Sequence, residues 1–165
     1  MSSATAQQKD LVVGVADGKF TNQKDGTITT YALGSCLGIT LYDRARLLGG
    51  LIHIMLPTPK EGASTAKVFM YLEKGLPIAL QKFQSAGSRV SQLECKVFGG
   101  ARVMQADNYF SIGDKNIEKC RQMSQQTGLK VSVWEVGGQL NRTIKFQMSD
   151  GKVKVRTPGK PEFYM

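Results

Sequence analysis

The strongest structural signal in the chain lies at residues 27–57, which read TITTYALGSCLGITLYDRARLLGGLIHIMLP. Short runs of β-branched, aromatic and aliphatic residues alternate here with glycine-containing or charged turns, a pattern that favours strands over helices. The predicted strands span residues 27–33, 37–42 and 47–56. The turn from Asp43 to Leu48 can bring the second and third strands side by side, and Pro57 stops the third because proline cannot pair inside a sheet.

The rest of the chain predicts two helices and further short strands. Apolar residues recur at helical spacing over residues 64–86, where Gly75 and Pro77 should kink the helix or split it in two. The second helix is predicted over residues 111–126, with Gly128 suited to its C-terminal cap. Further strands are expected at 11–15, 93–98, 129–136, 143–148 and 152–156, and a turn at 20–26.

The length and the order of these elements predict one domain. A chain of 165 residues can form one domain with a real core and is too short for two. We expect an α/β fold, a single domain with mixed β-sheets in a sandwich-like arrangement and two to three flanking helices. The domain should span residues 11–156, between a flexible N-terminal tail at 1–10 and a C-terminal tail at 157–165.

The composition is that of an ordinary globular protein, with 41% hydrophobic and 21% charged residues. No apolar run approaches the roughly 18–20 residues that cross a bilayer, and the N-terminus lacks the apolar segment of a signal peptide. We therefore expect a cytoplasmic protein without membrane insertion. The three cysteines include no CxxC pair, which agrees with a reducing compartment.

The net charge of +9 can attract nucleic acid, anionic lipid or an acidic protein surface, and it does not choose among them. Nucleic-acid binders usually add exposed aromatic residues or a reading helix to their charge. Here 8% of the residues are aromatic, and most of them alternate inside strand-like runs. We expect no nucleic-acid partner, and a solvated basic face is the simplest alternative.

Two side chains are candidates for chemistry. His53 is the one histidine of the chain, and it lies in an apolar run where a polar ring needs a hydrogen-bond partner. Cys36 lies between Gly34 and Gly38, which remove bulk around the thiol. Each also has an ordinary structural explanation, because His53 can be a satisfied core histidine and Cys36 a buried core thiol.

Together, Cys36 and His53 could supply the nucleophile and the general base that covalent acyl transfer requires at minimum. A free thiol has a pKa of about 8.5, so a histidine within hydrogen-bond reach is needed to take its proton. A third group should orient the imidazole. Thr30 is the best-placed candidate because its strand leads directly into the Cys36 turn, although a β-branched residue in a strand needs no such role.

Other chemistries fit the sequence poorly. Residues 34–38 match the G-x-C-x-G form of a hydrolase nucleophile elbow, but a strand rather than a helix is expected after Cys36, and no histidine follows His53. One histidine and three scattered cysteines give no zinc spacing, and no glycine motif for nucleotide binding is present. We therefore expect no cofactor and no metal.

Several sequence blocks occur in a characteristic order. They are TYALGSC at 30–36, LYD at 41–43, GGLIHIMLP at 49–57, KVFGGA at 96–101, IGDKNI at 112–117, and the glycine pair at 137–138 followed by Arg142. In these blocks the chain resembles the CheD family, the chemoreceptor glutamine deamidases, and departs from its pattern at Ile52, Glu135 and Asn141. Position by position, the resemblance places the catalytic residues of the family on Cys36, His53 and Thr30.

The resemblance implies a reaction and partners. The Cys36 thiolate would attack the side-chain amide of a receptor glutamine and form a thioester, which water then hydrolyses to glutamate with His53 as acid and base. The backbone N–H groups around Gly34, Ser35 and Leu37 would hold the oxyanion. The implied partners are methyl-accepting chemotaxis receptors, as protein substrates, and a CheC-type phosphatase.

Two further hypotheses concern binding. The alternative to an enzyme is a non-catalytic chemotaxis adaptor that binds receptors or a CheC-type phosphatase and needs no thiolate. Basic residues also gather near the C-terminus, and we expect them to steer the protein toward acidic receptor helices. These residues are Lys145, Lys152, Lys154, Arg156 and Lys160.

Overall fold

The structure is a computed structural model that describes residues 9–102 and 111–165. The described residues form two five-stranded sheets and two α-helices. We call the sheet ordered β1-β3-β8-β9-β10 the outer sheet and the sheet ordered β2-β5-β4-β6-β7 the central sheet. The strands are β1 (Asp10–Val12), β2 (Gly18–Thr21), β3 (Thr27–Leu33), β4 (Leu37–Asp43), β5 (Leu48–Ile54), β6 (Glu94–Gly99), β7 (Val131–Val136), β8 (Arg142–Gln147), β9 (Val153–Arg156) and β10 (Phe163–Tyr164). The helices are α1 (Leu72–Ser85) and α2 (Ile112–Thr127), with short 3-10 turns at η1 (Val68–Met70) and η2 (Val90–Gln92).

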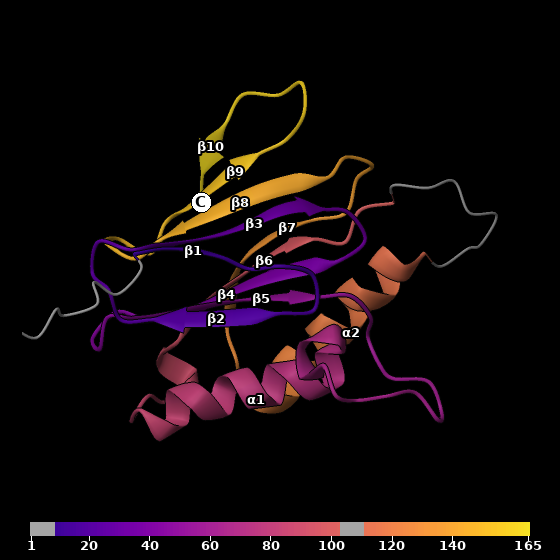
Figure 1. Ribbon diagram of the computed structural model, residues 1–165, viewed down its shortest axis with the longest axis horizontal. Coiled ribbons are helices and arrows are strands. Elements are labelled where there is room, and N and C mark those ends of the chain that lie inside the picture. The colour runs from indigo at the N-terminus through magenta and orange to yellow at the C-terminus, as the bar shows by residue number, and fades with distance from the viewer. Residues whose placement is uncertain (1–8, 103–110) are drawn as a thin grey trace, which may run out of the picture.

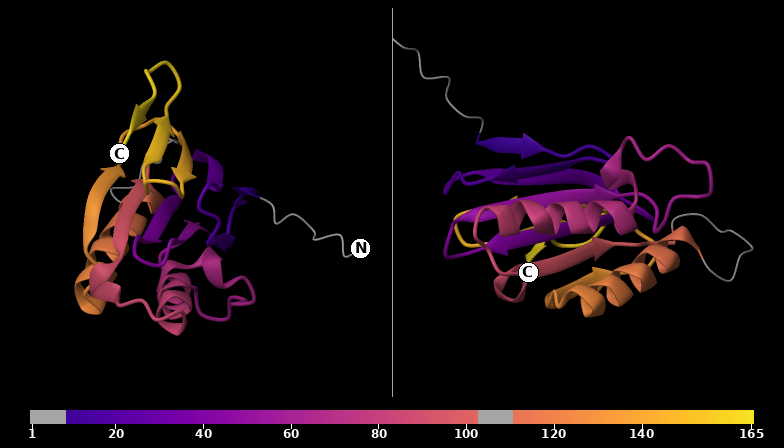
Figure 2. Two further views of the ribbon diagram at one scale, coloured as in Figure 1. Left: turned by 90° about the vertical axis from the view of Figure 1, so that its left-hand side faces the viewer. Right: turned by 90° about the horizontal axis from the view of Figure 1, so that it is seen from below.

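The elements form three layers, with both α-helices on one face of the central sheet and the outer sheet on its other face (Figures 1 and 2). β4 lies in the middle and is buried along its whole length. Leu37, Ile39 and Leu41 pack in the core shared with the helices, whereas Tyr42 packs in the core between the sheets. This alternation follows from the two-residue period of a strand. The predicted fold, a mixed-sheet α/β sandwich with flanking helices, is confirmed.

The central strands pair as the sequence predicted. β4 and β5 are antiparallel neighbours joined by the turn between Asp43 and Leu48, which face each other in the register. Gly38 lies opposite His53 in the same ladder. This pairing sets which face of the central sheet His53 occupies.

The second helix agrees with its prediction more closely than the first. Ser111 caps α2 by accepting from the Asp114 N–H, and Gly128 follows it with φ 75°. α1 begins later than expected, at Leu72, and continues without a break through Pro77. Its buried apolar stripe on the central sheet offsets the missing proline hydrogen bond. In the described part of the chain, neither helix has the length and apolarity that a bilayer crossing requires.

Two short edge strands were not predicted. β2 pairs with β5 where a turn was expected, and its Phe20 ring packs against Phe69 and Phe83. β10 pairs with β9 within the segment that was expected to be a C-terminal tail, and the backbone of Met165 exchanges two hydrogen bonds with Val153. The predicted N-terminal tail falls largely on residues 1–8, outside the described residues.

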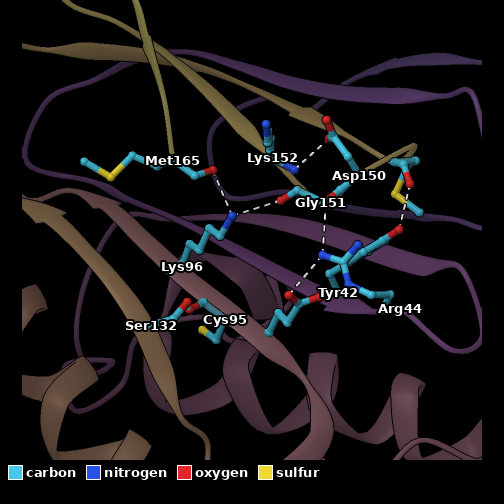
Figure 3. A network of polar contacts seen from close by, with 11 residues as sticks. Tyr42, Arg44, Cys95, Lys96, Ser132, Asp150, Gly151, Lys152 and Met165 are labelled. Carbon is cyan, nitrogen blue, oxygen red and sulfur yellow. Dashed lines mark hydrogen bonds and ion pairs between the residues drawn. The ribbon is translucent and has the colours of Figure 1, made fainter.

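A polar network joins the two sheets at the end of β4 that lies away from Cys36 (Figure 3). Lys96 on β6 donates to the carbonyls of Gly151 and Met165, at 3.0 and 2.8 Å. The Tyr42 hydroxyl donates to the Met148 carbonyl at 2.8 Å. We call these contacts the far-end network, and they tie the central sheet to β9 and its flanking turns.

Candidate active site

A bulge near the end of β3 shapes the approach to the site. Ala32 has φ 52°, and the pairing of β3 with β8 shifts register between Thr30 and Leu33. Both Thr30 and Leu33 are therefore fully buried, although they lie three residues apart, and Tyr31 between them is exposed. The chain then passes through the Cys36 turn (residues 34–36) into β4.

Thr30 and His53 meet between the two sheets. Thr30 Oγ1 lies 2.7 Å from His53 Nδ1 and donates to the Val13 carbonyl at 2.8 Å. Because the hydroxyl has one proton and gives it to Val13, it accepts from the ring, so Nδ1 carries the hydrogen of a neutral imidazole. The contact therefore leaves the lone pair on Nε2.

The surroundings keep the His53 ring neutral. The residue is 2% exposed, and burial lowers its pKa from 6.5 to about 4. Within the described residues, Nε2 is buried and has no hydrogen-bond partner. A buried acceptor of this kind is costly, at about 1–3 kcal/mol, and calls for an explanation. At neutral pH the ring thus presents a free basic nitrogen.

Cys36 lies just before β4, at one end of this inter-sheet region. It is two residues before Gly38, the partner of His53, and packs half-buried against the apolar core between the sheets. Its side chain therefore shares a face with the His53 ring. No hydrogen bond joins the Cys36 sulfur to Nε2, and burial raises the pKa of the thiol. The structure thus has a neutral thiol and a neutral imidazole facing the same inter-sheet region, with no hydrogen bond between them.

Two carbonyl groups of the Cys36 turn accept hydrogen bonds from the chain just after β6. Ala101 N–H donates to the Gly34 carbonyl at 2.8 Å, and Gly100 N–H donates to the Cys36 carbonyl at 2.9 Å. Within the part of the chain that the structure describes, the N–H groups of Gly34 and Ser35 donate to no acceptor. These two are among the residues predicted to hold an oxyanion. The third, Leu37, is the first paired residue of β4.

Asn116 on α2 is a site residue that the sequence analysis did not identify. Its fully buried amide donates to the Ser35 carbonyl at 3.0 Å and to the Met55 carbonyl at 2.9 Å. It therefore fastens the Cys36 turn to the chain just after His53. The available signal was a polar residue on the buried helix stripe that includes Cys120 and Met123.

Gly99 and Arg142 complete the support of the turn. Gly99 has φ 102°, and a Cβ atom there would lie 2.2 Å from the Cys36 carbonyl oxygen, so any side chain would displace the turn. Arg142 is buried, donates to the Gly99 and Gly137 carbonyls, and forms an ion pair with Glu135 at 3.5 Å. Both residues act through the backbone around Cys36.

Among the described residues, the other cysteines lie away from this site. Cys95 and Cys120 are free and buried in the core beneath the helices. Across residues 9–102 and 111–165, no group of three His, Cys, Asp or Glu side chains could hold a metal ion. The fold and the site thus define a two-sheet α/β protein in which a half-buried cysteine and a neutral, threonine-bound histidine face the same inter-sheet region.

Comparisons with known proteins identify the family of this chain. The family model described as CheD chemotactic sensory transduction matches residues 55–157, which is more than half of the sequence but begins after Thr30, Cys36 and His53. The chain belongs to the CheD family.

Relatives from bacteria and archaea match over nearly the whole length. A probable chemoreceptor glutamine deamidase CheD 1 from Syntrophus aciditrophicus is 33% identical over 92% of this chain and 96% of its own. Proteins named probable chemoreceptor glutamine deamidase CheD from Pyrococcus horikoshii and Pyrococcus abyssi are 37% and 34% identical, over 92% and 90% of this chain and 96% and 91% of theirs. A solved Bacillus licheniformis structure, hypothetical protein YfiH, has a TM-score of 0.43 at 14% identity, covering 74% of this chain and 50% of that one, which is too slight to support an argument.

Proposed function

We propose that this protein is a chemoreceptor glutamine deamidase, which hydrolyses glutamine side chains of methyl-accepting chemotaxis receptors to glutamate in the cytoplasm. The observation that carries the proposal is the His53 ring, whose Nδ1–H is fixed by Thr30 while its buried Nε2 has no partner among the described residues, in the inter-sheet region against which Cys36 packs. A core histidine that served packing alone would be expected to have both nitrogens satisfied. The names of the relatives supply the substrate class.

In the proposed first half-reaction, Cys36 is the nucleophile and His53 the general base. Because thiol and imidazole are both neutral in the resting site, the proton moves from Sγ to Nε2 as sulfur attacks the amide carbon. The N–H groups of Gly34 and Ser35 are the proposed donors to the oxyanion, since neither has an acceptor in the described residues. Collapse breaks the C–N bond, Nε2–H protonates the departing nitrogen, and ammonia leaves a thioester on Cys36.

The second half-reaction uses the same groups in reverse. Nε2 takes a proton from water, the resulting hydroxide adds to the thioester carbon, and the C–S bond breaks. The sulfur recovers its proton from the imidazolium, and glutamate is released. Thr30 acts throughout as a positioning residue, because it holds the ring in the tautomer with Nε2 free.

Mass spectrometry of a receptor cytoplasmic fragment tests this proposal. We expect the protein to replace an amide NH₂ by OH at defined glutamines, and Cys36→Ala to abolish the change. Cys95→Ala is the matched control, because Cys95 is fully buried on the helix side of the central sheet. Deamidation that persists in Cys36→Ala would refute the nucleophile.

One observation favours a second candidate, a non-catalytic adaptor that binds receptors or a CheC-type phosphatase. The Cys36 thiol has a raised pKa and no hydrogen bond to His53, so the resting site is not activated in advance. An adaptor would bind its partners equally well with Cys36→Ala and would leave every receptor glutamine unchanged. Pull-down of a CheC-type phosphatase by wild type and variant, beside the mass measurement, separates the two candidates.

A further inference from the structure

The outward face of the outer sheet, which lies on the side away from the helices (Figures 1 and 2), carries two adjoining hollows. One hollow of about 240 Å³ crosses β3, β8 and β9, and an adjoining one of about 430 Å³ extends it toward the turn after β9. They share Thr143, Arg156 and Glu162. We call this surface the basic groove, and the residues of its walls that matter here are Tyr31, Lys145, Lys154, Arg156, Lys160 and Glu162.

The groove holds more positive charge than its own carboxylate balances. Lys145 on β8 lies directly opposite Lys154 on β9, and like charges in that position destabilise a sheet. Lys154 pairs with Glu162 at 2.8 Å, whereas Lys145 and Arg156 have no ion pair among the described residues. Lys160 adds a further exposed cation to the adjoining hollow. Such an arrangement is suited to an anionic partner.

The spacing of the cations fits carboxylates on a helix. Arg156 lies opposite Thr143 and Lys145 opposite Lys154, so Lys145 and Arg156 are diagonal neighbours about 7–8 Å apart. Side chains at i and i+4 on one helix face lie about 5–6 Å apart, and the long lysine and arginine side chains can close this difference. Two glutamates one turn apart can therefore meet Lys145 and Arg156 while an aliphatic or aromatic neighbour contacts the exposed Tyr31 ring. The carboxylate of Glu162 in the wall disfavours a continuous phosphate backbone, so an acidic polypeptide fits better than a nucleic acid.

The groove is continuous with the elements that carry the candidate active site. β3 places Tyr31 on the outer face and Thr30 on the inner face, and leads directly to Cys36. The adjoining hollow reaches Asn141, next to Arg142, whose guanidinium holds Gly99 beneath the Cys36 turn. An extended substrate can therefore contact the groove and the Cys36 turn at once.

We propose that the basic groove binds a carboxylate-bearing helical stretch of the protein substrate while a glutamine of the same substrate lies at Cys36. This inference rests on the proposed deamidase function and adds a recognition site to it. Of the cations expected to steer the protein to its receptor, Lys145, Lys154, Arg156 and Lys160 line the groove, and Lys152 does not.

Paired double variants test the groove. Lys145→Gln with Arg156→Gln removes two unpaired groove cations, and Lys74→Gln with Lys130→Gln removes two exposed lysines near the helices, which makes the same change in net charge. For deamidation of a receptor fragment at low salt, we expect the groove variant to raise KM about three- to tenfold with kcat unchanged, and added salt to shrink the difference. The control should keep KM within about twofold of wild type.

A binding measurement separates this proposal from the deamidase proposal. The probe is a fluorescent helical peptide without glutamine, with glutamates at i and i+4, compared with a serine twin in an anisotropy titration. We expect the wild type to prefer the acidic peptide and the groove variant to lose that preference, with an unfolding midpoint at or above wild type. This binding result does not depend on whether the protein deamidates any receptor glutamine.

Several results would overturn the groove assignment. If the two double variants raised KM equally, the attraction would come from the overall charge and not from the groove. If the acidic peptide and its serine twin bound equally well, the groove would not recognise carboxylates. A lower kcat or a lower unfolding midpoint in the groove variant would show that Lys145 and Arg156 support the fold and do not bind the substrate. Tighter binding of a single-stranded oligonucleotide than of the acidic peptide, lost in the groove variant, would assign the surface to nucleic acid instead.

Discussion

The buried polar groups near the two ends of β4 differ in how completely they are hydrogen-bonded. At the far-end network, the Tyr42 hydroxyl and the Lys96 ammonium both reach backbone carbonyls of the outer sheet's turns (Figure 3). At the Cys36 end, His53 and Asn116 each satisfy one polar group and leave another buried and unpartnered within the described residues. One further unpartnered atom, a Glu94 carboxylate oxygen, lies near the far end, but its companion oxygen binds Arg44.

This difference distinguishes polar groups that stabilise the fold from polar groups that remain available for chemistry. A satisfied hydrogen bond such as that of the Tyr42 hydroxyl contributes to stability, and its proton is not available to a substrate. A nitrogen such as Nε2 of His53 costs stability and is available for proton transfer. We therefore expect substitutions at the Cys36 end to change rates more than stability, and substitutions at the far end to do the reverse.

The largest effect is expected for His53→Gln. Losing the base should lower kcat for receptor deamidation by about 10²–10⁴-fold, because each half-reaction starts with proton transfer to Nε2 and ends with proton transfer from it. Stopped time courses followed by mass spectrometry measure this rate. A variant that keeps more than a tenth of the wild-type kcat would contradict the role given to the ring.

The next effect is expected for Thr30→Val. The methyl group in place of the hydroxyl frees the ring to adopt the other tautomer, and we expect kcat to fall about 10–100-fold, as for other groups that orient a working histidine. Thr30→Ser restores the hydroxyl and should recover most of the rate. Similar losses in both variants would show that the packing of the side chain matters, not its hydrogen bond.

At the far end, Tyr42→Phe should lower the free energy of unfolding by about 1–2 kcal/mol and leave kcat and KM unchanged. The change leaves the Met148 carbonyl without its donor but keeps the edge-on contact with Phe146, at a centroid distance of 5.7 Å. Urea unfolding measures the loss, with Tyr31→Phe as a control because Tyr31 is exposed. A change in kcat or KM would show that the far end of β4 also affects catalysis.

The smallest effect concerns pH. Burial lowers the pKa of His53 from 6.5 to about 4, so the unfolded chain binds a proton between these values that the folded protein does not. Stability should therefore fall as pH drops through this window, by about 1.4 kcal/mol at ~pH 5.5. His53→Gln should remove this part of the pH dependence, measured as the difference in unfolding midpoint from wild type. Parallel pH curves for the two proteins would show that the ring titrates normally.

The elements predicted best from sequence are those with a strong local pattern. β3, β4, β5 and α2 matched because strand alternation, a short turn and a cap with Gly128 are properties of neighbouring residues. β2 was read as a turn because its short polar run becomes a strand through pairing with β5. Asn116 was missed as a site residue because its partners lie in two distant segments of the chain.

The amino-acid sequence alone establishes the central strands and offers a single histidine, so the choice of a base for Cys36 follows from composition. The tautomer and the lowered pKa of His53 depend instead on packing between the sheets, and the placement of the groove cations depends on strand pairing within the outer sheet. Thr30 meets His53 because β3 and β5 belong to facing layers, and Lys145 meets Lys154 because β8 and β9 pair. Local patterns set the backbone of each strand, whereas burial and charge balance arise from residues that are remote along the chain.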